Sequence, residues 1–128
     1  MHVVNFEDIS PFGLPGLTHR TVAGPDQDLK KCEVWVQTIV PGAETPVHRH
    51  DCEEVIIILS GRGVCESEGK THAFGANSAL VIPPNAVHQI INTGEEGMNL
   101  IGVLTMTPVR VETPEGERIR LPWDQDLS

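Results

Sequence analysis

Four side chains in two short segments have the types and the spacing of a metal site. His48 and His50 lie two positions apart, so on a β-strand their rings share one face, about 7 Å apart along the strand. Glu54 begins an apolar run and offers a hard oxygen ligand, and His88 begins another run shortly after two prolines. Neutral imidazoles with a carboxylate suit zinc, iron, manganese, nickel or copper, and they suit calcium poorly. The pattern therefore predicts a divalent-metal site.

The other histidines and the cysteines do not join this pattern. His2 is terminal, His72 lies in an expected edge hairpin, and His19 could line a pocket mouth but has no companion. The cysteines are Cys32, Cys52 and Cys65. Because their number is odd and no C-x-x-C spacing occurs, we expect free thiols rather than a disulfide framework or a cysteine zinc site.

Short β-branched runs separated by turn residues must position the candidate ligands. No segment repeats apolar residues at i, i+3, i+4 and i+7 over three turns, and ten prolines and twelve glycines are spread along the chain. The expected strands are 32–40, 54–59, 64–68, 71–74, 78–82, 87–92 and 99–111, the last bent at Pro108. A type II′ turn at Gly69-Lys70 would join the third and fourth of them. This pattern predicts an all-β sandwich or barrel.

The length and charge limit the organisation and the partners. A chain of 128 residues is one domain, which we divide into an N-terminal arm at 1–30, with 12–24 packed on the barrel, a core barrel at about 31–112 and a short C-terminal tail at 113–128. The net charge of −9, without a basic cluster, disfavours nucleic acids and anionic membranes. No apolar run approaches a membrane span, and no signal peptide or disulfide framework is evident, so we expect a cytoplasmic protein.

The candidate ligands lie within two motifs that resemble those of the cupin superfamily. The first motif is filled by Gly42, His48, His50, Glu54 and Gly61. The second is matched by Pro83, His88 and Asn92, while Asn77 and Asn85 replace its two glycines. Asparagine is the best non-glycine residue at turn positions with positive φ. The resemblance implies a double-stranded β-helix, or jelly-roll, barrel with a three-histidine, one-glutamate site.

A closer resemblance is to the plant auxin-binding proteins. It rests on Leu-Pro-Gly-Leu-Thr-His at 14–19, Thr-Pro-Val-His-Arg-His at 45–50 and Leu-Pro-Trp-Asp at 121–124. The resemblance implies a zinc ion that binds the carboxylate of an auxin, with Gln37 helping to hold that carboxylate. It also implies apolar walls formed by Leu14, Leu17, Thr45, Pro46, Ile56 and Trp123.

This chain departs from the plant proteins at several positions. Ile56 replaces an aromatic residue, and the segment after Glu112 lacks their second tryptophan, so two flat surfaces for an indole ring are missing. The chain also lacks a terminal Lys-Asp-Glu-Leu address and their terminal cysteine pair. These departures favour a relative of the plant receptor rather than the receptor itself.

Three functions fit these observations. The first is metal-dependent binding of a small, aromatic carboxylic acid. The second is a metalloenzyme, such as an iron, manganese or nickel dioxygenase, isomerase or lyase, in which Glu44 or His19 would serve as general base. The third is a metal-binding barrel that serves assembly, and the cupin resemblance implies a homodimer. The identity of the metal distinguishes the first two hypotheses.

Overall fold

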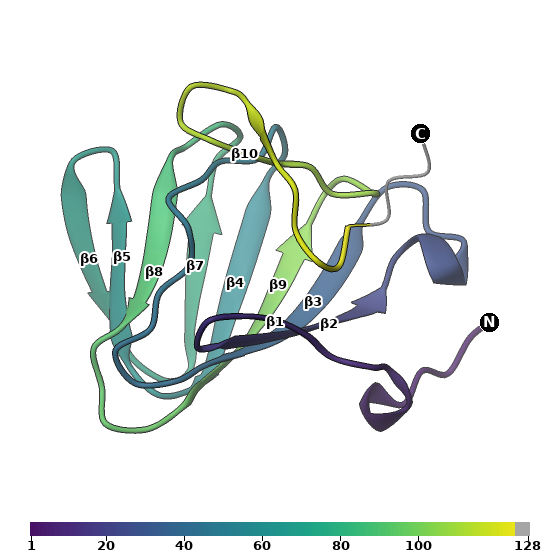
Figure 1. Ribbon diagram of the computed structural model, residues 1–128, viewed down its shortest axis with the longest axis horizontal. Helices are drawn as coiled ribbons and strands as arrows, with labels where there is room; N and C mark the ends of the chain where they lie inside the picture. The colour runs from purple at the N-terminus through teal and green to yellow at the C-terminus, as the bar shows by residue number, and fades with distance from the viewer. Residues whose placement is uncertain (125–128) are drawn as a thin grey trace.

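Alternating apolar residues form antiparallel sheets that face each other as a barrel in the computed structural model, which describes residues 1–124 (Figure 1). The larger sheet has the strand order β1-β2-β3-β9-β4-β7. Its strands are β1 (Phe12–Leu14), β2 (Leu17–Ala23), β3 (Glu33–Ile39), β9 (Met98–Leu104), β4 (Glu54–Ser60) and β7 (Ser78–Ile82). The smaller sheet comprises β6 (Lys70–Phe74), β5 (Gly63–Ser67) and β8 (His88–Asn92). The fold is the small jelly-roll barrel that the sequence predicts.

The core lies between the two sheets because the central strands alternate strictly. In β3 and β9 every second side chain is buried, as the period of two in a strand requires. Ile39, Ile58 and Leu104 are fully excluded from solvent. The inward faces of β3 and β4 also carry buried polar residues, among them Gln37 and Glu54.

The segment 43–50 runs along the smaller sheet as an irregular strand. Isolated bridges join Glu44 to Ile91, His48 to His88 and Arg49 to Glu112. Because of these bridges, the segment that carries His48 and His50 is fixed to β8, the strand that carries His88.

The turns around the site adopt the positive φ that the motifs require. Asn77 and Asn85 both have φ of 63°, and Gly42 and Gly61 have φ of 80° and 88°. At Gly61 a Cβ atom would approach the backbone of Met98 to 2.9 Å, so a side chain there would also clash. The expectation that asparagine can replace glycine in these turns is confirmed.

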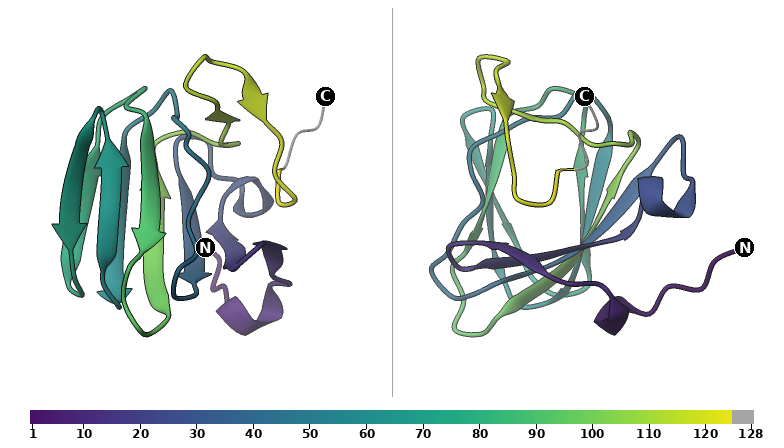
Figure 2. Two further views of the ribbon diagram at one scale, coloured as in Figure 1. Left: turned by 60° about the vertical axis from the view of Figure 1, so that its left-hand side comes forward. Right: turned by 45° about the vertical axis from the view of Figure 1, so that its right-hand side comes forward.

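The N-terminal region contributes more to the sheet than the sequence indicates. Residues 12–24, expected as a packed arm, contain β1 and β2, and β2 pairs with β3 from Val34 to Ile39. Before them a short 3-10 helix, η1 (Phe6–Asp8), leads away from the barrel (Figure 2). A second one, η2 (Pro25–Gln27), precedes β3.

Two other local expectations need correction. The β5–β6 turn is Glu68-Gly69, not Gly69-Lys70, because Ser67 already pairs with Lys70. Both turn residues have positive φ, 51° and 77°, as a type I′ turn requires. The expected last strand at 99–111 ends at Leu104, and the chain then bends through Pro108 into β10 (Val111–Glu112).

The C-terminal tail crosses one end of the barrel. Its strand β11 (Arg118–Ile119) pairs with β10, and Trp123, further along the tail, belongs to the core cluster. Within residues 1–124, no helix is long and apolar enough to cross a membrane.

Candidate metal centre

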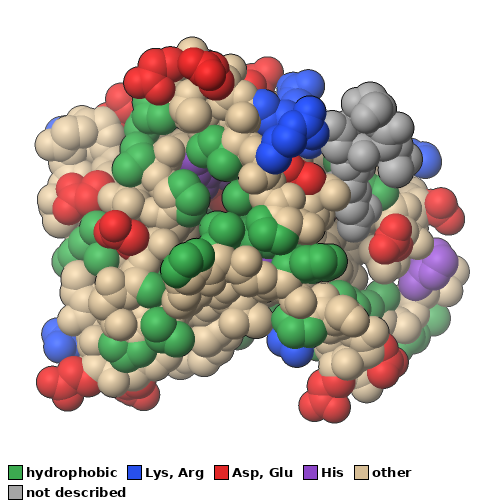
Figure 3. Space-filling view, viewed as in Figure 1, with side chains coloured by type: hydrophobic (Ala, Val, Ile, Leu, Met, Phe, Trp, Pro, Cys, Tyr) green, Lys and Arg blue, Asp and Glu red, His purple; other side chains and the backbone are tan. Residues whose placement is uncertain are grey.

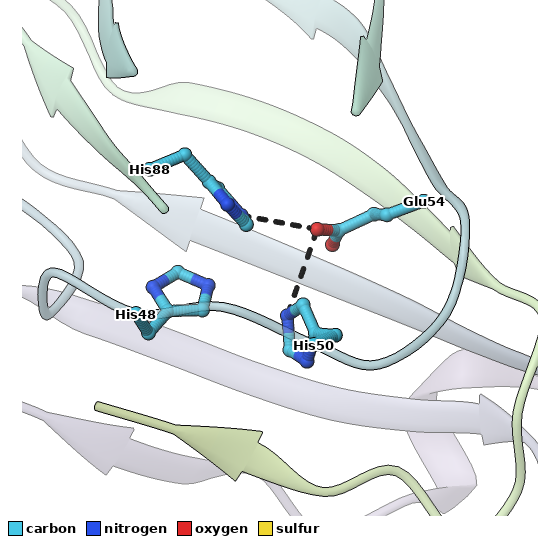
Figure 4. Close-up of side chains that lie close together, drawn as sticks. All are labelled: His48, His50, Glu54 and His88. Atoms are coloured by element: carbon cyan, nitrogen blue, oxygen red, sulfur yellow. Dashed lines mark ion pairs between the residues drawn. The ribbon is translucent and has the colours of Figure 1, made fainter. Parts of the chain in front are cut away.

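Four side chains from three parts of the fold meet inside the barrel. His48 and His50 come from the segment before β4, Glu54 is the first residue of β4, and His88 is the first residue of β8. One nitrogen or oxygen atom from each lies within 4.8 Å of the others, and all four residues are buried (Figure 4). The structure thus brings together the ligand set expected from the sequence.

Backbone pairing fixes the distance between two of the ligands. The amide of His48 donates to the carbonyl oxygen of His88 at 3.0 Å, and the amide of His88 donates back at 2.8 Å. The two ring centroids therefore lie 4.2 Å apart. His50 lies on the same side as His48, with its ring centroid at 4.9 Å, as the i, i+2 spacing requires.

Backbone carbonyl groups set the tautomer of all three rings. The Nδ1–H groups of His48, His50 and His88 donate to carbonyl oxygens at 2.6, 3.1 and 2.8 Å. The acceptors are Pro46, Arg110 and Ala86. A carbonyl oxygen can only accept, so each Nδ1 carries the proton and each Nε2 is left as the metal-binding atom.

The atoms that face the centre lack hydrogen-bond partners. Among the described residues, Nε2 of His50, Nε2 of His88 and Oε1 of Glu54 are buried without one. Only ion-pair contacts join them, at 3.6 Å from His50 and 3.1 Å from His88 to Oε1 of Glu54. Buried polar atoms without partners are costly, and a divalent cation would satisfy all of them at once. The donor set therefore fits a metal ion.

The electrostatics prepare the same atoms for a cation. Burial lowers the pKa of His48 from 6.5 to about 3, and burial also lowers the pKa of His50. Burial alone would raise the pKa of Glu54, but the contact with His88 and the charges of the neighbouring rings bring this pKa below 4.5. Burial opposes a charge on His88, yet contact with Glu54 raises the pKa of this ring above 6.5. When His88 is charged, its Nε2 also carries a proton, and a metal ion would replace that proton.

An apolar cavity lies beside this cluster. Its lining includes His48, Glu54 and His88, and the other lining side chains are mostly apolar. All seven residues expected at a ligand pocket are among them: Leu14, Leu17, Gln37, Thr45, Pro46, Ile56 and Trp123. In Figure 3 hydrophobic side chains surround an opening with histidine visible inside it. The cavity measures about 40 Å³, which is room for a few water molecules rather than an organic ligand.

The C-terminal tail limits the size of the cavity. Leu121 and Trp123 line it, and the ring of Trp123 stacks on His19 with 3.9 Å between centroids. Asp124 accepts a hydrogen bond from the amide of Leu121 at 2.8 Å and pairs with Arg118 at 3.7 Å. Trp123 is buried, yet its indole Nε1 has no hydrogen-bond partner.

His19 supports the cavity wall. It is fully buried, with Nδ1 accepting from Gln37 at 2.9 Å and Nε2 donating to Thr21 at 2.7 Å. Both ring nitrogens are therefore engaged, and burial lowers the pKa of His19 to about 3. Glu44, the other expected general base, does not line the cavity either.

Sequence reasoning missed several residues of the wall. Trp35, Leu100, Val111 and Leu121 also line the cavity. Trp35 could have been found, because the alternation of its strand places it on the same face as Gln37. Its indole N–H donates to the buried carboxylate of Glu33 at 2.8 Å, which holds the ring in place.

The sequence matches a known family over most of its length. The family model described as "Auxin binding protein" matches residues 3–116. Auxin-binding protein 1 of Arabidopsis thaliana is 37% identical over 133 residues, covering 89% of this chain and 67% of the relative. Auxin-binding protein T85 of Nicotiana tabacum is 39% identical over 112 residues, covering 78% of this chain and 60% of the relative. The chain thus spans roughly two thirds or less of the length of these relatives.

Solved structures confirm the architecture. The polyketide cyclase RemF of Streptomyces resistomycificus superposes with a TM-score of 0.74 at 21% identity, covering 97% of this chain and 89% of the cyclase. A cupin-2 domain from Rhodospirillum rubrum superposes with a TM-score of 0.73 at 15% identity, covering 88% and 80% of the two chains. At these identities the likeness shows the cupin fold and nothing about the reaction.

Proposed function

Because the chain belongs to the auxin binding protein family, we propose that it is a metal-dependent binding protein for a small aromatic carboxylic acid. The proposed metal is zinc, held by His48, His50, Glu54 and His88. One observation carries the proposal: buried, unpartnered ligand atoms stand at one wall of a cavity whose other walls are apolar. Such a site offers a charge for a carboxylate and an apolar surface for a ring.

The protein's own groups would have distinct tasks in binding. The four ligands would hold the ion, which when bound supplies a Lewis-acidic position for a carboxylate oxygen. Gln37 keeps one amide hydrogen beyond the one it donates to His19, so it can donate to the same carboxylate. Leu14, Leu17 and Ile56 would cover the ring, gaining about 25 cal/mol for each Å² of apolar surface.

The small volume of the cavity adds a condition to this proposal. Pockets for organic ligands usually enclose about 300–1,000 Å³, far more than the 40 Å³ found here. Leu121 and Trp123 occupy the required space, and the tail that carries them is held by the Arg118–Asp124 ion pair. Ligand binding would therefore displace the tail from the cavity.

Calorimetry of the zinc-loaded protein tests the proposal. We expect benzoate to bind, and indole-3-acetate to bind no more tightly, because Ile56 offers no flat surface for an indole ring. Benzamide is the matched control, since it keeps the ring but lacks the carboxylate. Binding that is absent for both acids, or that survives chelation of the metal, would refute the proposal.

The metalloenzyme hypothesis finds less support at this cavity. Apart from the ligands His48, Glu54 and His88, none of the described residues that line the cavity carries an ionisable side chain. The candidate bases are elsewhere, since His19 uses both ring nitrogens and Glu44 lies outside the lining. A general base must reach the proton that it removes, so we do not propose acid–base catalysis by these residues.

A further inference from the structure

Gly102 is a glycine in the interior of a regular strand, on the inward face of the larger sheet. The burial pattern of β9 places it with Leu100 and Leu104 on the buried side of the strand. It also lines the cavity beside the metal ligands. Glycine weakens a strand because it packs no side chain and loses much conformational freedom on folding. A glycine at this position therefore needs a physical reason.

The backbone around Gly102 does not supply that reason. Its φ lies outside the left-handed region, so a residue with a side chain could adopt the same backbone. Its pairing with Trp35 on β3 and with Ile56 on β4 is in register. The irregular pairing between β4 and β9 lies further along, between Ile58 and Ser60. Gly102 is therefore neither a turn residue nor a bulge.

Close packing does not supply the reason either. A Cβ atom on Gly61 would lie 2.9 Å from the Cα of Met98, so that glycine is required by its neighbour. The atom nearest to a Cβ on Gly102, apart from those of its chain neighbours, would be Oε2 of Glu54 at 3.7 Å. This is an ordinary van der Waals distance, so alanine would fit at position 102 without moving the surrounding residues.

The register of the sheet places Gly102 midway between two groups that would hold the ligand. Inward-facing rows cross β3, β9 and β4, which lie side by side in Figure 1. Gln37 pairs with Leu100 in one outer row, and Glu54 pairs with Leu104 in the other. Gly102 lies in the row between them and on the middle strand. Its Cα is therefore about 8 Å from the Cα of Gln37 and of Glu54, since strands lie about 4.8 Å apart and alternate residues about 6.7 Å apart.

The carboxylate of Glu54 links this position to the metal centre. Its Oε1 makes the contacts with His50 and His88, which the dashed lines in Figure 4 mark. Its Oε2 is the atom nearest to the place that a side chain of residue 102 would occupy. The space over Gly102 thus adjoins a metal ligand directly.

Taking the proposed function as the premise, we propose that Gly102 is a specificity-determining residue, whose missing side chain leaves room for the part of the ligand next to its carboxylate. A ligand held by the metal and by Gln37 must cross this position. Trp35 and Ile56 pair with Gly102 on either side, and both line the cavity. They would border the first ring atoms, with the bare backbone of Gly102 beneath.

This space favours acids whose ring is attached directly to the carboxyl carbon. In such acids the widest part of the molecule begins one bond from the carboxylate, which is where Gly102 leaves room. An arylacetate carries only a methylene group there, so it gains less from the missing side chain. The ligand class is therefore an aryl carboxylate, of which benzoate is the simplest member.

Calorimetric titration of zinc-loaded Gly102→Ala tests the proposal. We expect benzoate to bind about 10–200-fold more weakly than to the wild-type protein, the range by which one methylene group changes recognition in an apolar pocket. Acetate, which carries the carboxylate without a ring and is titrated at millimolar concentrations, should bind as it does to the wild-type protein. The matched control is Gly97→Ala, before β9, where a Cβ atom would lie 3.8 Å from Thr38 and outside the cavity lining. It should leave both affinities unchanged.

Thermal unfolding and elemental analysis show whether Gly102→Ala folds and holds the metal. Because alanine fits both the backbone and the space, we expect full zinc content and a Tm raised by about 2–4 °C. A lowered Tm, an unchanged affinity for benzoate, or an equal weakening of acetate and benzoate would each overturn the role of Gly102 and leave the proposed function standing. A wild-type protein that binds neither acid would overturn both.

Discussion

At the scale of single residues, the metal ligands are positioned before any ion arrives. Each of the three histidine rings is held through Nδ1 by a backbone carbonyl group, so the orientation of Nε2 does not depend on a metal. His48 and His88 are also locked to each other through their backbones. Preorganised ligands lose little conformational entropy on binding, which favours tight retention of the ion.

This arrangement predicts different results for two histidine substitutions. His48→Ala should abolish retention of the metal, because it removes one of four ligands. His72→Ala should leave the metal content unchanged, because His72 is exposed on β6, away from the site. Mass spectrometry of the metal in protein purified without added ions measures both. Equal metal content in the two variants would show that His48 is not a ligand.

The ligand residues could be predicted from the sequence because their signal is local. The His-x-His spacing places both rings on one face of a strand, and Glu54 stands at the start of the next apolar run, so these residues together indicate a single site. The support of Trp35 by Glu33 could not be predicted, since a buried carboxylate resembles any other glutamate in the sequence. The sequence shows His19 as a residue that could line a pocket mouth but has no companion, because its stacking on Trp123 depends on a contact over more than a hundred residues.

At the scale of elements, the C-terminal tail determines access to the cavity. Trp123→Ala removes the ring that stacks on His19 and fills the space beside the metal ligands. We expect unchanged metal content, faster association of benzoate, and a loss of about 3 kcal/mol in the free energy of unfolding, typical of truncating a buried tryptophan. Stopped-flow fluorescence of the remaining Trp35 measures the association rate.

Ile119→Ala is the control for this experiment. It lies in the same tail and packs against the core, but it does not line the cavity. It should lower stability and leave the association rate of benzoate unchanged. If both variants bind benzoate at the wild-type rate, the tail does not gate the cavity.

The elements differ in how well their sequences specify them. The central strands were predicted because their alternation and flanking turns are both strong. The β1–β2 hairpin was missed since Gly13, Pro15 and Gly16 suggest an irregular arm, and only pairing with β3 orders the segment. The expected β5–β6 turn is wrong by one residue because Glu68 adopts a positive φ, which glutamate residues disfavour.

At the scale of the whole molecule, burial of neutral histidines links stability to pH. His19 and His48 have pKa values of about 3 in the fold and 6.5 as the ordinary value. The unfolded chain therefore binds more protons below pH 6.5, so stability falls as the pH drops from 6.5 toward 3. His88 acts in the opposite direction, because its raised pKa gives stability below pH 6.5 that is lost as the pH rises through its folded value.

The metal-free protein should consequently be less stable at pH 5.0 than at pH 7.5. His19 and His48, whose pKa values are lowered, each reduce the free energy of unfolding by about 2 kcal/mol at pH 5.0. The lowered pKa of His50 adds to this loss, and the raised pKa of His88 offsets part of it. Urea unfolding in the presence of a chelator measures the difference. His19→Gln should reduce the pH dependence, because it removes one of these groups without touching a metal ligand, whereas His72→Ala should not change it. Equal stability of the wild-type protein at both pH values would mean that these rings are not neutral and buried as the structure places them.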